Sequence, residues 1–237
     1  MESWKCRSQA LMGVEAMERL ARARVAVFGL GGVGGHAAEA LARGGVGYLE
    51  LFDRDTVSLS NLNRQLAATI ADIGRPKAQV MALRCRAVAP GVQAVAREMF
   101  YLPENADEVD LASFDYLVDA VDTVAAKVEL ACRAAAAGVP IVSAMGCGNR
   151  LDATGFRVKD LFETQGDPLA RVMRRELRRR GIEHLTVVCS DAPVCPPAED
   201  SGEDKAPGRR APGSVSWVPG VAGMILAGEV IRDLCGV

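Results

Sequence analysis

Several absences in the 237-residue sequence exclude whole classes of protein. The seven cysteines are scattered singly and none stands in a C-x-x-C pair, so a zinc site built from two such pairs is excluded. The first twenty residues contain no secretory signal core. We therefore expect reduced thiols and a cytoplasmic location.

Aromatic residues are scarce, at 5%, and neither sign of charge dominates, with 28 Lys+Arg against 30 Asp+Glu. A net charge of −2 gives no global attraction to nucleic acid, so RNA binding would need a local basic patch. The uncharged run from Ala134 to Asn149 contains Pro140 and falls short of the roughly 20 apolar residues that span a bilayer. No membrane span is expected. The 49% of hydrophobic residues is enough for a core, which excludes a disordered chain.

Strand and helix patterns alternate along the first two thirds of the chain. Short apolar runs predict strands at 24–30, 48–53, 92–99, 116–121 and 139–144, and helical patterns occupy 36–43, 77–88 and 127–137. This alternation indicates an α/β fold, Rossmann-like and doubly wound, with a mostly parallel sheet and helices on both faces.

The last third predicts a C-terminal extension of this fold, with strands at 155–161 and 185–190, a basic helix at 168–180 and a closing helix at 221–234. We expect one domain over residues 1–237, with a nucleotide-binding half at about 1–145 and a substrate-side half at about 146–237. Prolines and mixed charges predict a mobile loop at 191–213.

A glycine-rich loop lies between the first predicted strand and helix. Its glycines are Gly29, Gly31, Gly32 and Gly34. Glycines there allow a tight turn and let backbone N–H groups approach a phosphate at the helix amino end. Asp53 ends the next strand, where a carboxylate can accept a ribose hydroxyl. The pattern predicts nucleotide binding, and a nicotinamide dehydrogenase remains an alternative at this point.

The segment after Asp53 favours a triphosphate over a nicotinamide. It places Asn61, Arg64 and Gln65 just past a strand end, and Lys77 begins the following helix. Fixed cations and amide donors suit a triphosphate that develops negative charge. Asp119 and Asp122, in a D-x-x-D-T turn, end the fourth predicted strand, and a carboxylate there can hold Mg²⁺ against the phosphates.

Together these residues resemble the ThiF/MoeB/HesA family of adenylating enzymes, which are related to ubiquitin-activating enzymes. The resemblance runs from about Arg7 to Met145. It implies a site for ATP formed by Gly29, Gly31, Gly32, Gly34, Asp53, Asp55, Asn61, Arg64, Gln65, Lys77 and Asp122. It further implies catalytic roles for Arg64, Lys77 and Asp122, with Asp122 linked to Mg²⁺. Arg7 resembles the family's arginine that reaches the phosphates of the partner subunit in a homodimer.

Two stretches of the last third, 167–178 and 212–219, are similar to the branch of this family that dehydrates threonylcarbamoyladenosine in tRNA. This similarity implies an ATP-dependent dehydratase that adenylates the threonylcarbamoyl carboxylate and closes a ring, releasing AMP and pyrophosphate. The alternative is an adenylyltransferase that activates the C-terminal glycine of a ubiquitin-like sulfur carrier, with that carrier or a cysteine desulfurase as partner. A dehydrogenase or a non-catalytic nucleotide-binding module would make the segment after Asp53 coincidental.

A basic stretch at 171–180 holds six arginines and one glutamate in a chain that is net acidic. Arginine binds phosphates well, so we expect tRNA contacts there, against the alternative of a solvated helix face. The expected contacts are Arg171, Arg174, Arg175, Arg178 and Arg179.

Two cysteines are candidates for a thiol that accepts an acyl group, Cys147 and Cys189, although buried cysteine more often acts as a small hydrophobe. Cys189 and Cys195 lack the spacing of a typical metal clip. His36 and His184 have no partner pattern and are predicted to be structural.

Overall fold

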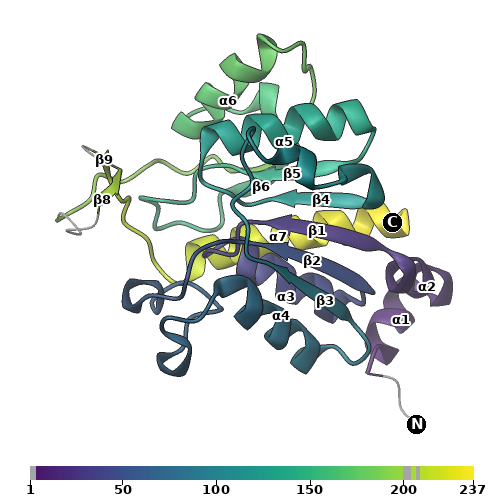
Figure 1. The fold of residues 1–237 in the computed structure, drawn as a ribbon. Coiled ribbons are helices and arrows are strands. Elements are labelled where there is room, and N and C mark those ends of the chain that lie inside the picture. Colours follow the sequence, from purple (N-terminus) through teal and green to yellow (C-terminus); the bar gives the residue numbers. More distant parts are fainter. Residues whose placement is uncertain (1–3, 200–203, 207–208) are drawn as a thin grey trace.

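Strands and helices alternate along the chain, and the strands form a central sheet with helices on both of its faces (Figure 1). The computed structural model describes residues 4–199, 204–206 and 209–237. The helices are α1 (Cys6–Met12), α2 (Val14–Arg22), α3 (Gly34–Gly44), α4 (Lys77–Val88), α5 (Val124–Ala137), α6 (Pro168–Arg178) and α7 (Trp217–Cys235). The strands are β1 (Arg24–Phe28), β2 (Tyr48–Phe52), β3 (Gln93–Arg97), β4 (Tyr116–Asp119), β5 (Ile141–Ala144), β6 (Phe156–Asp160), β7 (Thr186–Ser190), β8 (Asp204–Ala206) and β9 (Arg209–Arg210).

Seven strands form one sheet in the order β3-β2-β1-β4-β5-β7-β6. All neighbours are parallel except β6, which pairs antiparallel with β7. The predicted doubly wound, mostly parallel sheet is therefore confirmed. Strand order reverses between β1 and β4, and ligands of such sheets bind beyond the carboxyl ends of the strands at this point.

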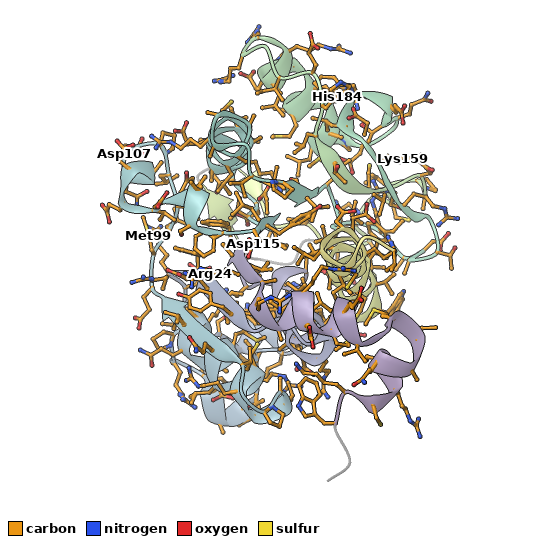
Figure 2. The ribbon with its side chains drawn as sticks, turned by 90° about the vertical axis from the view of Figure 1, so that its right-hand side faces the viewer. Arg24, Met99, Asp107, Asp115, Lys159 and His184 are labelled. Atoms are coloured by element: carbon orange, nitrogen blue, oxygen red, sulfur yellow. The ribbon has the colours of Figure 1, made fainter. Side chains whose placement is uncertain are left out.

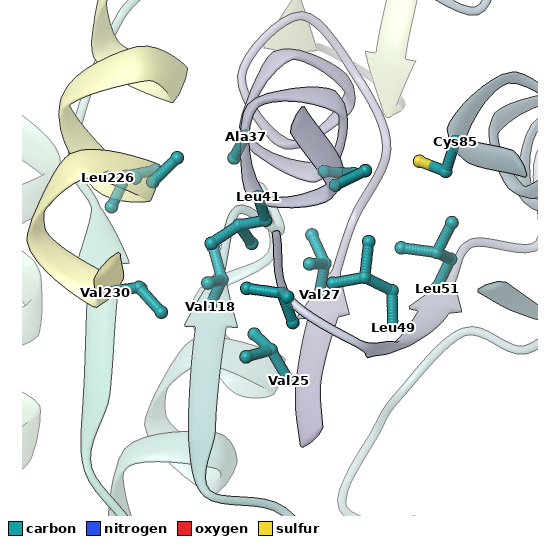
Figure 3. Packing of buried hydrophobic residues seen from close by; sticks show 14 of the residues in the cluster. Val25, Val27, Ala37, Leu41, Leu49, Leu51, Cys85, Val118, Leu226 and Val230 are labelled. Atoms are coloured by element: carbon teal, nitrogen blue, oxygen red, sulfur yellow. The ribbon is translucent and has the colours of Figure 1, made fainter. Parts of the chain in front are cut away.

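One face of the sheet packs against α3, α4 and α7. Val25, Val27, Leu49 and Leu51 from β1 and β2 are fully buried there, together with Leu41 of α3 (Figure 3). Central strands of a parallel sheet are covered on both faces, which explains why their sequences are runs of apolar residues rather than alternating ones.

The opposite face is covered by α5 and α6, which lie together on the other side of the sheet from α3 and α4 (Figure 1). Leu130 of α5 packs over Phe28 and Phe52, whose rings stack with centroids 4.5 Å apart. Met173 and Leu177 of α6 pack in a separate buried cluster over β7. Helices on both faces are thus confirmed.

Element boundaries differ from the prediction chiefly at α7. This helix begins at Trp217 rather than at residue 221, because Pro219 lies in the first turn, where a missing N–H costs no hydrogen bond. Helices α3 and α5 also begin earlier than predicted, at Gly34 and Val124. Among the described residues, no helix has the length and apolar composition needed to cross a membrane.

The predicted loop at 191–213 is tied at its base to the turn after β5. Residues 200–203 and 207–208 of this loop lie outside the described residues, and β8 and β9 pair antiparallel between them. Asn149, the only non-glycine with a positive φ (55°) among the described residues, donates its N–H to Gly213 O and accepts from Gly213 N at Oδ1. Its carbonyl also accepts from Cys195 N. One residue therefore holds both ends of the loop.

Candidate active site

The glycine loop joins β1 to the amino end of α3 in a conformation that two of its glycines require. Gly29 has φ of 84°, and a Cβ there would lie 2.7 Å from Ala120 O. A Cβ on Gly34 would lie 1.8 Å from Gly29 O. These two positions close the turn tightly against the end of β4, so their main role is to shape the loop.

Space for a ligand lies at Gly31 instead. In the part of the chain that the structure describes, the only atom within 4 Å of a Cβ built on Gly31 is Gln65 Nε2, at 3.9 Å. The amide oxygen of Gln65 is buried and has no hydrogen-bond partner within the described residues. Among these residues no side chain caps the amino end of α3, whose first N–H groups carry partial positive charge. The glycine loop is therefore open toward an anion and lies beside a polar group that lacks a partner.

Asp53 fixes this loop from the end of β2. Its Oδ2 accepts from Leu30 N at 2.7 Å, and its Oδ1 accepts from Asp55 N at 2.8 Å. Burial raises the pKa of the Asp53 carboxyl, while the charge of Lys77 and the two backbone N–H donors act in the opposite direction. Each carboxylate oxygen keeps a second acceptor site, so the side chain can also bind a hydroxyl.

Lys77 is the first residue of α4 and is almost completely buried, with a side chain 7% exposed. Its Nζ donates to Asp55 Oδ2 at 3.1 Å, and Asp55 is largely exposed. A lysine at a helix amino end opposes the helix dipole, so this site favours an additional anion. Lys77 and the amino end of α3 thus both favour negative charge at the carboxyl edge of the sheet.

Asn61 and Arg64 lie on the segment between β2 and α4. Asn61 is buried, and its Oδ1 accepts from Ser58 N at 3.1 Å in a capping box that shapes a 3₁₀ turn. Arg64 Nη1 donates to Ser60 O and to Asn63 Oδ1, each at 2.9 Å. Asn61 thus has a structural role that the sequence did not reveal, while Arg64 is partly exposed and held by local contacts.

Asp122 is exposed on the turn after β4, and its Oδ1 accepts from Thr123 Oγ1 at 3.4 Å. Nearby Asp119 is buried and paired with Lys127 Nζ at 3.0 Å. Of these two acids, Asp122 is the one accessible to a ligand. Across the described ranges, no three His, Cys, Asp or Glu side chains gather as metal ligands, so a cation here would need ligands from a bound molecule.

Arg7 is far from the glycine loop of its own chain. It is exposed on α1, and the preceding Lys5 donates to Gly45 O, which lies before β2 at the amino edge of the sheet. The next helix, α2, contacts Cys235 at the carboxyl end of α7, whereas Pro219 of α7 touches the glycine loop. The part of α7 between Pro219 and Cys235 is roughly 24 Å long. Arg7 is therefore not brought to the other predicted site residues.

The basic helix α6 presents most of its arginines to solvent. Arg171, Arg175, Arg178, Arg179 and Arg180 are exposed. Arg175, Arg179 and Arg180 share the single acid Glu176. Arg174 differs, because its Nη1 donates to Thr164 O at 2.8 Å and its side chain is only partly exposed. The predicted basic patch is thus formed by four of its five named arginines, together with Arg180.

Of the two candidate thiols, Cys189 is buried and Cys147 is partly buried. Burial, followed by the charge of Asp167, raises the pKa of Cys147 to about 12 and that of Cys189 to about 11. The nucleophile is the thiolate, so neither group is activated at neutral pH. His36 Nδ1 donates to Gly32 O at 2.8 Å. His184 lies exposed at the surface (Figure 2), with Nδ1 3.4 Å from Asp160 Oδ2.

Two buried ion pairs near the site were missed by sequence reasoning. One is Lys127–Asp119, and the other joins Arg150 to Asp167 at 2.9 Å with both side chains at most 1% exposed. Lys127 lies one helical turn before Leu130, on the face of α5 that packs against the sheet. The helical period of this segment was the signal that could have revealed a buried lysine.

Comparison with known proteins gives matches over almost the whole chain. The chain matches the ThiF family over residues 6–237. A relative from Bacillus subtilis (strain 168), a tRNA threonylcarbamoyladenosine dehydratase, is 39% identical over 236 residues, which cover 96% of this chain and 93% of the relative.

Solved structures of E. coli tRNA N6-threonylcarbamoyladenosine dehydratase, TcdA, are also similar. The complex with AMP has a TM-score of 0.89 at 30% identity and covers 100% of this chain and 96% of that chain. The complex with ATP has a TM-score of 0.86 at 30% identity, with the same coverage. The similarity therefore includes both the glycine-loop half and the α6–α7 half of this chain.

Proposed function

This chain belongs to the ThiF family, and we propose that it is an ATP-dependent enzyme that dehydrates threonylcarbamoyladenosine in tRNA. The observation that carries the nucleotide part is the opening at Gly31, at the amino end of α3 and beside the side chain of Gln65, whose amide oxygen has no partner among the described residues. The substrate part is supported by relatives that match both halves of the chain.

The site residues divide into two groups in this proposal. The nucleotide site is formed by Gly29, Gly31, Gly32, Gly34, Asp53, Asp55, Asn61 and Gln65. The phosphates are bound by Arg64, Lys77, Asp122 and the partner's Arg7. Asp53 accepts the ribose hydroxyls with the oxygens that also fix Leu30 and Asp55. Lys77 exchanges its contact with exposed Asp55 for a phosphate oxygen, which leaves no buried charge without a partner.

The donor set at the end of β4 fits Mg²⁺ bound with a nucleotide. This ion takes one or two protein carboxylates and completes its coordination with phosphate oxygens and water, and Asp122 offers one accessible carboxylate. Bound there, Mg²⁺ would neutralise charge on the phosphates. Asp122 would hold it.

Catalysis in this proposal consists mainly of positioning and charge stabilisation. The threonylcarbamoyl carboxylate attacks the α-phosphate of ATP and pyrophosphate leaves. The carbamoyl group then attacks the resulting acyl-adenylate, closes a five-membered ring and expels AMP, so the substrate loses one water. Lys77 and Arg64 stabilise the negative charge that develops on the phosphates. The attacking group already belongs to the substrate, so no thiol is needed.

The exposed arginines of α6 would bind tRNA phosphates, and Arg7 would complete the site of a second copy. The position of Arg7 supports a homodimer, since it cannot serve the glycine loop of its own chain. An enzyme of tRNA would act in the cytoplasm. We treat residues 1–237 as one adenylating domain, whose loop at 191–213 lies on the substrate side.

The proposal is tested by following pyrophosphate release from ATP with two acceptors, tRNA that carries threonylcarbamoyladenosine and a ubiquitin-like sulfur carrier. Release with tRNA that disappears in Lys77→Met supports the proposal. Release with the carrier alone would replace it with the adenylyltransferase alternative. Tight NAD binding with no response to ATP would reject adenylation altogether.

A further inference from the structure

A buried polar cluster at the carboxyl ends of β4 and β5 has no part in the mechanism above. Lys127 of α5 and Asp119 of β4 each have side chains 1% exposed. Lys127 Nζ donates to Asp119 Oδ2 at 3.0 Å, to Ser143 Oγ at 3.1 Å and to Ala144 O at 2.7 Å. The three N–H donors of the ammonium group therefore each have an acceptor.

Stability alone is a poor reason for this ion pair. Moving two charges out of water is costly, and well-packed apolar residues in place of a buried pair are often at least as stable. A fully satisfied buried network does fix the geometry of the segments that it joins. Here it joins α5 to the ends of β4 and β5.

Asp119 links this cluster to the turn at 119–123 by hydrogen bonds. Its Oδ1 accepts from Val121 N at 3.2 Å, while its Oδ2 is held by Lys127 and Ser143. The turn also touches the glycine loop, since Ala120 O lies 2.7 Å from the Cβ position of Gly29. The next residue after Val121 is Asp122, so the cluster fixes the backbone immediately before that acid.

We propose, on the premise of the function proposed above, that Lys127 is a positioning residue that holds the turn at 119–123 so that Asp122 faces the magnesium-bound phosphates of ATP. Lys127 is too deeply buried to touch the nucleotide itself. It acts through Asp119 and the backbone of Val121. Groups that orient a metal-binding side chain in this way commonly change affinity by about 10–100-fold when they are removed.

The test measures equilibrium binding of ATP with Mg²⁺ and of AMP to Lys127→Met and to the unmodified chain. We expect ATP affinity to fall about tenfold or more, and AMP affinity to change less than about threefold, because AMP lacks the phosphates that share the metal. Amide hydrogen exchange should become faster at 120–123. Arg133→Met is the matched control on the same helix, since it removes ion pairs to Asp107 and Glu129 at the surface.

Two further variants cover the case in which Lys127→Met does not fold because it leaves the Asp119 charge unpaired. Lys127→Met with Asp119→Asn removes both charges and keeps an acceptor for Val121 N. Ser143→Ala keeps the ion pair and removes the two contacts of Ser143 Oγ, with Lys127 Nζ and with Asp119 Oδ2. Each should lower ATP affinity in the same direction and spare AMP.

A folded variant of Lys127 that binds both nucleotides like the unmodified chain would overturn the inference. So would an equal loss for ATP and AMP without faster exchange at 120–123, because that result describes general destabilisation. If the unmodified chain binds no ATP, that result rejects the proposed function itself, independently of any effect of the Lys127 variants.

Discussion

Single side chains in the candidate site serve both the fold and the ligand. Asp53 is an example, because its two oxygens accept from Leu30 N and Asp55 N, and the proposed function gives the same carboxylate a ribose to bind. Asn61 likewise accepts from Ser58 N in the capping box of a 3₁₀ turn, and its carbonyl accepts from Arg64 N. Substitutions at such positions must therefore be measured for stability and for binding separately.

Asp53→Ala should lower both the free energy of unfolding and the affinity for ATP. Two backbone N–H groups lose their acceptor, and leaving a buried donor unpaired costs about 1–3 kcal/mol of unfolding free energy. ATP affinity should also fall, because the ribose acceptor is gone. Denaturant unfolding and calorimetric titration of ATP measure the two effects. Full ATP affinity in a destabilised variant would show that Asp53 only shapes the loop.

Cys147→Ala should leave the rate of the reaction within about twofold of the unmodified enzyme. With its pKa raised to about 12 by burial, Cys147 forms almost no thiolate at neutral pH. Labelling at pH 7.5 should therefore modify the exposed Cys6 and spare Cys147. Loss of activity in a folded Cys147→Ala variant would instead establish a covalent thiol step.

Among the elements, α6 carries the exposed arginines that we propose bind the phosphates of tRNA. Changing Arg171, Arg175 and Arg179 to Glu should weaken tRNA binding and lower the slope of log affinity against log salt by about one unit per lost phosphate contact. Binding of ATP should not change, because α6 packs over β7 rather than at the glycine loop. Filter binding over a salt series measures the effect.

Two matched variants separate recognition from folding in this experiment. Arg22→Glu changes an equally exposed arginine on α2 and should leave tRNA binding unchanged. Arg174→Ala should lower stability by about 1 kcal/mol without altering the salt slope, since Arg174 contacts Thr164. If the triple variant binds tRNA with the original affinity and slope, α6 is only a solvated face.

Local patterns predicted most elements, because strand runs and helix signals are short-range. Helix α4 spans Lys77–Val88, as Pro76 and the apolar period indicate. The antiparallel direction of β6 was not predictable, because it depends on pairing with β7, which lies far along the chain. The inward position of Arg174 depends on tertiary packing in the same way. The place of the glycine loop between β1 and α3, and of Asp53 directly after β2, was predictable because the signals lie in adjacent residues.

At the scale of the whole molecule, the proposed role of Arg7 at the phosphates requires a second copy of the chain. Arg7→Ala and Lys77→Ala chains should each be inactive, yet mixing them under subunit exchange should restore about a quarter of the activity of the unmodified dimer. Half of the mixed dimers would be heterodimers with one intact site each. Activity assays with analytical ultracentrifugation check this prediction. A fully active monomer, or a mixture as inactive as its parents, would contradict it.

The central claim is that the chain closes a ring on a modified nucleoside in tRNA. The most direct measurement is mass spectrometry of nucleosides from tRNA bearing threonylcarbamoyladenosine after incubation with the protein, ATP and Mg²⁺. We expect this nucleoside to be replaced by a product lighter by one water, only when ATP is present and not with Lys77→Met. An unchanged nucleoside in the presence of protein that binds ATP would contradict it.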